Sequence, residues 1–530
     1  MSECLPLIKK IPVTSDVLAL FEGLSSRPYS FLLDSGLIVP ELARYSIMGA
    51  DPFLVLRSRG KRLWLERDGK STSLVGHPLV KLKNLLARYR LAPGSHPLSF
   101  GGGAVGYFSY DLGRVLEKLP ALAADDLHTP DLCLGFYDVV TVIDRVAEEV
   151  WVVSTGFPET NPAAAEQRAR KRLAETCTLL IREQGKQIEP KQRKVAPILA
   201  IAEPPQPVLP QSWAGDAPRA VPRTDDSSLK KYPGSEGAPP VLSAHFDEAG
   251  YCGAVQRVKE YIAAGDIFQA NLSQRFSLPR VTEPWPLYRR LRAINPAPMA
   301  AYLNFGEFQV VCSSPERFLK VNGRQVETRP IKGTRPRGQD PASDARLREE
   351  LWKSAKDRAE LVMIVDMERN DLGRVCRPGS VRVPELYRLE EYATVFHLVS
   401  IVEGELAPGR DVVDLLAAAF PGGSISGAPK VRAMEIIEEL EPVRRGIYTG
   451  SIGYLGFDQN ADLNIVIRTL IFKGDQIYFQ VGGGITIDSD PYREYVETLD
   501  KARALVRALG LDDRQAFASL QVKPAVEKGR

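Results

Sequence analysis

The sequence predicts an α+β fold in which strands and helices are grouped along the chain, and three observations support this class. Short apolar strands separated by turns dominate residues 1 to about 155. From 245 to about 510, helix and strand patterns both become denser, but they occur in blocks rather than in strict βαβ alternation. The length of 530 residues exceeds the usual size of a single-core domain, so we expect two domains or one large composite domain.

Several elements of the N-terminal region can be assigned from local pattern. The apolar segments 53–56 and 139–143 predict strands. Three adjacent glycines follow Phe100 next to aromatic residues, which predicts a close backbone approach inside a sheet. Residues 162–183 are rich in Ala, Arg, Glu and Leu and start with proline, so we expect a helix there.

The composition changes over residues 185–240, where Pro, Lys, Arg, Gly and Ser dominate and hydrophobic periodicity disappears. A long structureless stretch is unusual inside a compact domain, so we expect a linker or a mobile insertion. The predicted division is therefore an N-terminal region 1–184, the linker 185–240, a C-terminal region 241–515 and a tail 516–530.

The C-terminal region begins with a predicted helix, because Tyr251, Val255, Val258 and Ile262 share one helical face. Segments 310–312 and 466–472 are apolar and predict buried strands.

Bulk properties exclude several classes of protein. A net charge of +3 is small for this length and gives no reason to expect nucleic acid or a membrane surface as partner. The N-terminus lacks the pattern of a secretory signal, and no apolar run approaches the roughly 20 residues that span a bilayer. The six cysteines are scattered without a CxxC pair, so we expect reduced thiols in a cytoplasmic protein.

Four acidic residues form two pairs with the same spacing. Asp357 and Glu360 open one predicted helix, and Glu494 and Glu497 lie in another that starts at Pro491. Residues spaced i, i+3 share a helical face, and two such faces in one cleft would need a cation to neutralise them. Mg²⁺ usually takes one or two carboxylates, so one residue of each pair would bind it directly. The same spacing also suits two solvated helix faces.

Two glycine-rich segments are candidate anion sites. Residues 421–430, PGGSISGAPK, precede a helix expected near Pro429, and a glycine turn before a helix N-terminus can bind an anion. Gly482, Gly483 and Gly484 could offer backbone N–H groups to a carboxylate. Either segment could instead serve only close packing.

A basic segment at 329–338 places Lys332 among Arg329, Arg335 and Arg337 in what its Pro and Gly residues predict to be a constrained turn. A lysine beside other cations has a lowered pKa and can act as a nucleophile. A carboxylate clamp or a solvated basic face would have the same composition. His397, in an apolar run, is either a satisfied core residue or a functional one.

Together and in this order, these segments resemble the chorismate-utilising enzymes related to anthranilate synthase component I. The N-terminal part also resembles the family, in Arg44-Tyr-Ser-Ile-Met-Gly and Gly102-Gly-Ala-Val-Gly-Tyr. The C-terminal half matches in Gly265-Asp-Ile-Phe-Gln, Ser314-Pro-Glu-Arg-Phe, Pro330-Ile-Lys-Gly-Thr-Arg-Pro-Arg-Gly, Met363-Ile-Val-Asp, Arg369-Asn-Asp-Leu-Gly, His397-Leu-Val-Ser, Pro421-Gly-Gly-Ser-Ile-Ser-Gly-Ala-Pro-Lys and Gly482-Gly-Gly-Ile.

The resemblance implies a sandwich of two large, mostly antiparallel sheets flanked by helices, with the active site in the C-terminal part. It implies that Glu360 and Glu497 are Mg²⁺ ligands supported by Asp357 and Glu494. Glu316 would be the general acid for the leaving C4 hydroxyl, and His397 would lie close to the reacting ring. The substrate-contacting positions would be Gly333, Thr334, Tyr448, Arg468, Gly482, Gly483 and Gly484.

Lys332 indicates the branch of the family. Anthranilate synthases resemble this stretch but carry alanine in Pro-Ile-Ala-Gly-Thr, whereas aminodeoxychorismate synthases carry the lysine, which attacks C2 of chorismate. Asn271 also resembles the second branch, and Leu361 departs from the His or Asn found in many relatives. The resemblance therefore implies synthesis of 4-amino-4-deoxychorismate from chorismate and ammonia.

The chain has no recognisable glutaminase segment, so we expect a separate glutamine amidotransferase subunit (component II) as the ammonia source. The alternatives are anthranilate synthase component I and, from another class, a non-catalytic protein that binds an anion such as chorismate. Isochorismate or salicylate synthase fits the Pro-Ile-Lys-Gly-Thr pattern less well. Relatives bind tryptophan near positions matching 33–35 and 295–299, where Met299 departs from the usual aromatic residue.

Overall fold

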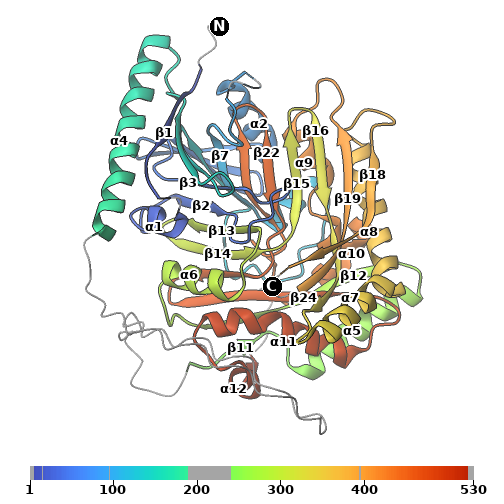
Figure 1. The fold of residues 1–530 in the computed structure, drawn as a ribbon. Coiled ribbons are helices and arrows are strands. Elements are labelled where there is room, and N and C mark those ends of the chain that lie inside the picture. Colours follow the sequence, from blue (N-terminus) through green and yellow to red (C-terminus); the bar gives the residue numbers. More distant parts are fainter. Residues whose placement is uncertain are drawn as a thin grey trace, which may run out of the picture.

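A computed structural model describes residues 5–14, 16–92, 94, 96–188, 240–392 and 395–522. Two large, mostly antiparallel sheets form its centre, and helices lie around them (Figure 1). The predicted α+β class and the predicted sandwich of two sheets flanked by helices are therefore confirmed.

The first sheet has 13 strands, and all neighbouring strands are antiparallel except the parallel last pair. The strands, in spatial order, are β1 (Leu7–Ile11), β10 (Glu149–Ser154), β9 (Val139–Asp144), β3 (Tyr45–Gly49), β2 (Ser30–Asp34), β13 (Met299–Asn304), β14 (Phe308–Ser314), β23 (Thr469–Lys473), β24 (Gln476–Ile485), β12 (Gln269–Pro279), β11 (Ser243–Ala244) and β25 (Gln521–Val522), with β20 (Gly427–Ala428) beside β12.

The second sheet has 12 strands. They are, in spatial order, β17 (Ile331–Pro336), β19 (Val395–Glu405), β16 (Gln325–Arg329), β15 (Arg317–Asn322), β22 (Ala461–Asn464), β21 (Ser451–Gly456), β7 (Gly103–Phe108), β8 (Leu132–Tyr137), β4 (Leu54–Arg59), β5 (Arg62–Arg67) and β6 (Lys70–Val75), with β18 (Arg382–Glu391) beside β19.

Both sheets combine strands from the two ends of the chain. In the first, β2 pairs with β13, so that Leu32 lies opposite Tyr302. In the second, β7 pairs with β21, where Gly106 lies opposite Gly453. Gly103, one of the three adjacent glycines, has φ +159°, and a Cβ there would come within 2.3 Å of the Leu455 carbonyl oxygen, so the predicted close backbone approach is confirmed. A buried core that includes Val105 and Val310 joins the two sheets.

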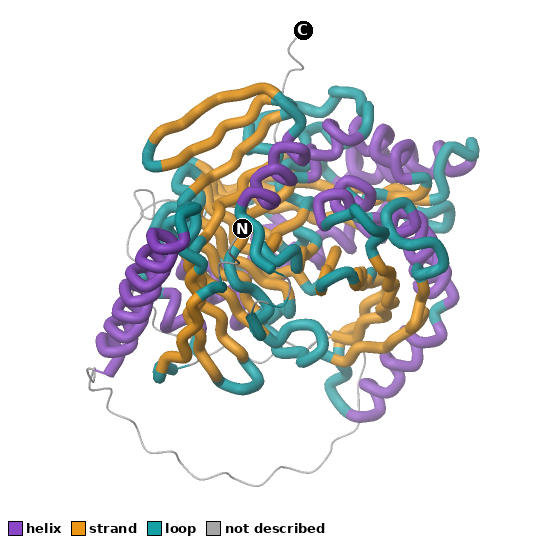
Figure 2. The backbone as a smooth tube through the Cα atoms, turned by 90° about the horizontal axis from the view of Figure 1, so that it is seen from above, coloured by secondary structure: helices purple, strands orange, loops and turns teal. Residues whose placement is uncertain are grey.

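Helices surround the sheets, as the view from above shows (Figure 2). Helices α5 and α11 pack on β24 of the first sheet, and α8 packs on β17 and β19 of the second. The helices are α1 (Val17–Phe21), α2 (Pro78–Arg88), α3 (Gly113–Leu116), α4 (Pro162–Ile188), α5 (Glu248–Ala263), α6 (Pro284–Ile294), α7 (Pro341–Lys353), α8 (Ala355–Gly373), α9 (Val412–Ala419), α10 (Lys430–Leu440), α11 (Pro491–Ala508) and α12 (Asp513–Ala518), with 3-10 turns η1 (Tyr110–Leu112) and η3 (Gly423–Ile425).

The helices expected over residues 162–183, near 251–262, from about 357, near 429 and from 491 are all present. One strand boundary was wrong. The segment 466–472 was expected to be a strand throughout, but β23 begins only at Thr469, because Arg468 adopts φ +53° and turns the chain.

Two other predictions concern residues only partly covered by the structure. Most of the expected linker, 189–239, and the end of the tail, 523–530, lie outside the described residues. In the described ranges no helix has the length and apolar composition needed to cross a membrane. Cys133, Cys177, Cys252, Cys312 and Cys376 are all free thiols.

Candidate active site

Strand β17 carries Lys332, Gly333 and Thr334 through a bulge. Ile331 pairs with Val399 and Thr334 with His397, so β17 holds one residue more than the facing stretch of β19. Gly333 adopts φ +83°, and a Cβ there would lie 2.7 Å from Leu351. The expectation of a constrained turn was therefore wrong: the segment is a strand, and its bulge re-aims Lys332.

Glu316 lies between β14 and β15, buried and close enough to Lys332 for the two charges to interact. Its carboxylate is hydrogen-bonded by Ser424 of η3 and by the backbone of Ile331. Burial raises its pKa to about 7, although the Ser424 hydrogen bond and the Lys332 amine both lower it. A carboxyl group with this pKa can hold a proton near neutral pH and give it away.

A second group of predicted residues gathers around His397. Its Nδ1 and the Thr334 hydroxyl share a hydrogen bond of 2.9 Å. Burial and the nearby Arg468 guanidinium lower the pKa of His397 to about 4, so the ring is neutral at physiological pH. Arg468 also lies close enough to Tyr448 to affect the pKa of its hydroxyl. The structure therefore places Thr334, His397, Arg468 and Tyr448 in one neighbourhood.

Gly482, Gly483 and Gly484 lie on β24, between the acidic residues of α11 and Lys332. Strand β23 pairs with β24 only as far as Phe479, whereas β12 pairs along Gly482–484. A Cβ on Gly483 would lie 3.2 Å from Glu494 Oε2 and 3.3 Å from Glu497 Oε1. A Cβ on Gly484 would lie 3.4 Å from Lys332 Nζ. Glycine thus leaves space beside both the acidic residues and the lysine.

The two acidic pairs belong to α8 and α11, as expected. The Ser354 hydroxyl caps α8 by accepting from the Asp357 N–H at 3.2 Å, and Asp490 caps α11 by accepting from Arg493 at 2.9 Å. Burial raises the pKa of Glu360, and Asp357 and Glu497 raise it further. The pKa of Glu494 is also raised, by burial and by Glu497. Glu360 and Glu497 therefore share one electrostatic environment.

These side chains suit a Mg²⁺ ion bound by few protein ligands. Within the described ranges, no three Asp, Glu, His or Cys side chains converge as a metal-binding group. Mg²⁺ needs only one or two carboxylates, with substrate and water completing its octahedron. Glu360 and Glu497 can supply this number, because both are hard oxygen donors and Glu497 lies close enough to raise the pKa of Glu360. Lys501, which pairs with Glu497 at 2.6 Å, would have to release it to the ion.

The predicted cause of the low Lys332 pKa was partly wrong. Burial lowers this pKa most. The arginines near it in sequence are not among the main causes. Each is paired with an acidic side chain: Arg329 with Glu390 at 2.5 Å, Arg335 with Glu350 at 2.8 Å and Arg337 with Asp344 at 2.6 Å. The cation that lowers the Lys332 pKa is Lys501, while Glu360, Glu316 and Glu497 raise it in part.

Two residues of the site were missed from the sequence. Lys501 lies one turn after Glu497 on α11, and its Nζ contacts Glu497 at 2.6 Å and the Gly482 carbonyl at 2.7 Å. The i, i+4 spacing of Glu497 and Lys501 was a detectable signal. Ser424 was included in the motif 421–430 but received no role, because nothing local connects it to Glu316.

A separate cavity of about 450 Å³ lies where relatives were expected to bind tryptophan. It is lined by residues of both chain regions, including Leu33, Ser35, Met299 and Tyr454. Met299 faces this cavity, so its departure from the usual aromatic residue changes the cavity wall. Tryptophan binding there stays a prediction.

Comparisons with known proteins show which family this chain resembles along most of its length. A family model described as chorismate binding enzyme matches residues 51–507. The chain is 39% identical over 517 residues to aminodeoxychorismate synthase component 1 of Bacillus subtilis (strain 168), covering 97% of this chain and 99% of that protein. It is 41% identical over 490 residues to anthranilate synthase component 1 of Thermus thermophilus, covering 91% and 92%. The crystal structure of anthranilate synthase component I from Streptococcus pneumoniae superposes with a TM-score of 0.70 at 30% identity, covering 89% and 93%.

Proposed function

The chain belongs to the chorismate binding enzyme family, and from this premise we propose that it converts chorismate and ammonia to 4-amino-4-deoxychorismate. The reaction would be Mg²⁺-dependent and would supply the precursor of para-aminobenzoate for folate synthesis in the cytoplasm. Identity alone does not choose between products, since relatives named for either synthase match this chain at 37–41%.

The observation that carries the choice of product is the setting of Lys332. Its amine lies beside Gly484, and partial burial lowers its pKa. Desolvation favours the neutral amine, which is the nucleophilic form. Glu316, the candidate acid, is bound by the backbone of Ile331, the residue that precedes Lys332. The proposal therefore takes Lys332 as nucleophile and Glu316 as acid, two groups that lie close enough for their charges to interact.

In the proposed reaction, the neutral Nζ of Lys332 bonds to C2 of the ring, the ring double bonds shift and the C4–oxygen bond breaks. Glu316 gives its proton to the departing hydroxyl, which leaves as water. Ammonia then bonds to C4, the double bonds shift back and the C2–Nζ bond breaks, with its electron pair returning to Lys332. The excess proton on the new ammonium group passes to the Glu316 carboxylate, which restores the starting state.

Other residues of the site would bind and orient the substrate. A Mg²⁺ ion held by Glu360 and Glu497 would neutralise the ring carboxylate. Arg468 has the fork geometry to bind the enolpyruvyl carboxylate with two hydrogen bonds. Thr334, Tyr448 and the backbone of Gly482–484 would complete the contacts. His397 would face the ring as a neutral imidazole, because its pKa is about 4.

The ammonia would come from a glutamine amidotransferase subunit. Two relatives of this chain are named component 1 of a synthase, which implies a second component. We therefore expect the chain alone to use ammonium salts but not glutamine. Turnover of glutamine by the purified chain would contradict this part of the proposal.

The proposal is tested by identifying the product formed from chorismate, Mg²⁺ and ammonium salt. We expect 4-amino-4-deoxychorismate and no anthranilate. Without ammonia, mass spectrometry of the protein should show a chorismate-derived adduct on Lys332 that is absent in Lys332→Ala. Release of anthranilate by the wild type would favour the anthranilate synthase alternative, in which ammonia itself attacks C2.

A further inference from the structure

A buried ion pair lies under the chain segment that carries Tyr448. Arg445 donates from Nε to Glu441 Oε2 at 3.0 Å and from Nη2 to Glu441 Oε1 at 2.7 Å. Both side chains are only 2% exposed. A buried pair of this kind adds little net stability compared with apolar side chains, but it fixes geometry because removal of one partner leaves an unpaired charge. The other contacts of Arg445 and Glu441 therefore show which parts of the chain this ion pair holds in place.

The Arg445 guanidinium connects three elements of the candidate active site. It donates from Nη1 to the carbonyl of Ile425 in η3 at 2.9 Å, and from Nη2 to the carbonyl of Asn271 on β12. Ile425 follows Ser424, the partner of Glu316, and Asn271 lies opposite Gly484. The guanidinium carbon also lies 6.0 Å from the centroid of the Tyr448 ring.

Glu441 extends the same network along β12. Its Oε1 accepts from the backbone N–H of Ser273 at 2.9 Å and from the Ser273 hydroxyl at 2.7 Å. The Ser273 hydroxyl in turn accepts from Gln480 Nε2 on β24 at 2.8 Å. The pair thus binds the strand that supports the glycine segment, in addition to the turn that supports Glu316.

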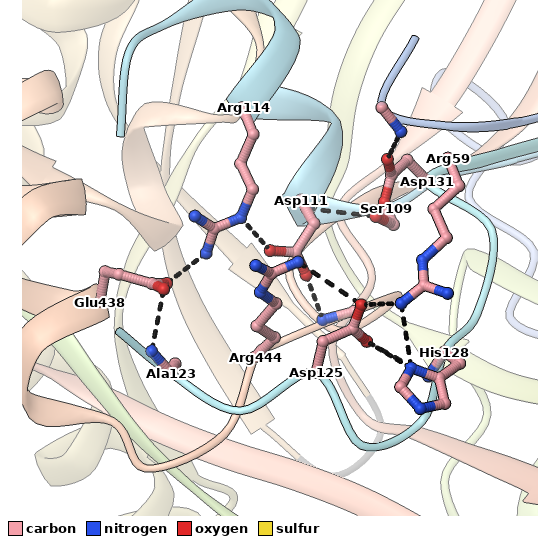
Figure 3. Close-up of polar contacts among 12 residues, drawn as sticks. Arg59, Ser109, Asp111, Arg114, Ala123, Asp125, His128, Asp131, Glu438 and Arg444 are labelled. Atoms are coloured by element: carbon pink, nitrogen blue, oxygen red, sulfur yellow. Dashed lines mark hydrogen bonds and ion pairs between the residues drawn. The ribbon is translucent and has the colours of Figure 1, made fainter. Parts of the chain in front are cut away.

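The same segment is held from the other side by the N-terminal region. The Gly446 N–H donates to Asp111 Oδ2 at 2.9 Å, and the Tyr110 N–H donates to the Gly446 carbonyl at 2.8 Å. Arg444 contacts Asp125 at 3.4 Å (Figure 3). The Tyr110 ring lies 4.8 Å from the Arg445 guanidinium, so Arg445 lies between this aromatic ring and Glu441. Residues 441–449 are therefore clamped between two networks.

We propose that Arg445, held by Glu441, is a positioning residue. It fixes the relative positions of Tyr448, the turn η3 that carries Ser424 and the strand β12 that carries Asn271 around the substrate. It touches no predicted reacting group itself, and it acts through the three elements that it joins. The inference rests on the proposed function only in taking Tyr448 and Glu316 to be part of the active site.

The test is a double-mutant cycle on the intact chain. Arg445→Lys keeps a positive charge but loses the fork that bonds Glu441, Ile425 and Asn271 together. We expect kcat/KM for chorismate to fall about 100-fold, as a misplacement near 1 Å does. Combined with Tyr448→Phe, the loss should be clearly less than the product of the two single losses, because Arg445 acts partly through Tyr448.

Arg168→Lys is the matched control. Arg168 also bonds a buried carboxylate and a main-chain carbonyl, Asp138 at 2.9 Å and Phe157 at 2.8 Å, but it lies on α4. It should lower the melting temperature without changing kcat/KM per folded molecule, and it should combine multiplicatively with Tyr448→Phe. If Arg445→Lys does not fold, the cycle is measured with Glu441→Gln instead. Gln has the shape of Glu, but its amide group cannot accept from Arg445 at both atoms.

Unchanged kcat/KM in the folded Arg445 or Glu441 variant would overturn the inference, as would purely multiplicative combination with Tyr448→Phe. The same cycle, measured on chorismate affinity without ammonia, does not depend on which product forms. Release of anthranilate by the wild type would therefore overturn the proposed function, whereas the affinity cycle would still decide whether Arg445 positions Tyr448.

Discussion

The amine of Lys332 lies over Gly484, so close that a Cβ on this glycine would come within 3.4 Å of Nζ. The same Cβ would lie 1.9 Å from Gln269 Nε2, a distance that forces a movement. A methyl group at position 484 would therefore displace the Gln269 amide and fill the space beside the candidate nucleophile without adding any chemistry.

Gly484→Ala should lower kcat/KM for chorismate by about 100-fold or more, because displacement of the reacting groups by about 1 Å has this effect. Gly253→Ala is the control, since this glycine lies in α5 and a Cβ there meets nothing within 4 Å. It should leave kinetics unchanged and raise stability slightly, because alanine favours helix. Steady-state kinetics and thermal unfolding check both variants.

Loss of either proposed metal ligand should remove Mg²⁺-dependent turnover while the fold remains. Glu360→Ala and Glu497→Ala each remove one of the two carboxylates proposed to bind Mg²⁺, which lie close enough for Glu497 to raise the pKa of Glu360. Asp500→Ala is the control on the same helix as Glu497, because Asp500 is 52% exposed and pairs with Arg503. Activity is measured as a function of Mg²⁺ concentration, with circular dichroism to verify folding. Full activity of either glutamate variant at ordinary Mg²⁺ would exclude its role.

The pH dependence of turnover should report Glu316. Its pKa is raised to about 7, so the acid form exists below that pH and is lost as pH rises through it. We expect kcat/KM at constant free ammonia to fall above about pH 7 for this reason. Ser424→Ala removes a hydrogen bond that lowers this pKa, so the falling limb should move to higher pH. A limb that moves to lower pH, or stays in place, would contradict the assignment.

His397 should remain neutral across the physiological range. Burial and Arg468 lower its pKa from 6.5 to about 4, so the ring in the folded protein should bind a proton only as pH falls toward 4. The accompanying loss of stability should begin near pH 6.5, where the unfolded chain binds the proton, and level off near pH 4. Assigned by comparison with His397→Gln, its ring signals in NMR should not titrate between about pH 5 and 8, the range in which an unperturbed histidine changes charge.

Much of the site could be predicted from the sequence because its residues lie in elements with strong local signals. The i, i+3 spacing of the acidic residues, with Pro491 at the start of α11, placed the acidic pairs on helix faces, and the motif order pointed to the family. The setting of Lys332 could not be predicted in full. Its neighbour Lys501 is 169 positions away, and the adjacent arginines pair with acids whose positions depend on the folded chain.

The sequence also did not predict which strands pair with one another in the two sheets. Nothing in the segments that form β2 and β13 shows that they lie side by side, because strand partners depend on the folding of the intervening 264 residues. The bulge in β17 was likewise predicted as a turn, since Pro and Gly favour both. The local sequence pattern therefore predicted the helices and strands, and the resemblance to a family predicted how they pack into two sheets.

The interleaving of early and late strands has a consequence for how the protein folds. When a ribosome has made the first 184 residues, β2 still lacks β13 and β7 still lacks β21, so two hydrophobic strand edges stay open until the second half emerges. Contacts this distant along the chain form slowly. We therefore expect folding to be completed only after synthesis, and the isolated first half to be prone to aggregation through its unpaired strand edges.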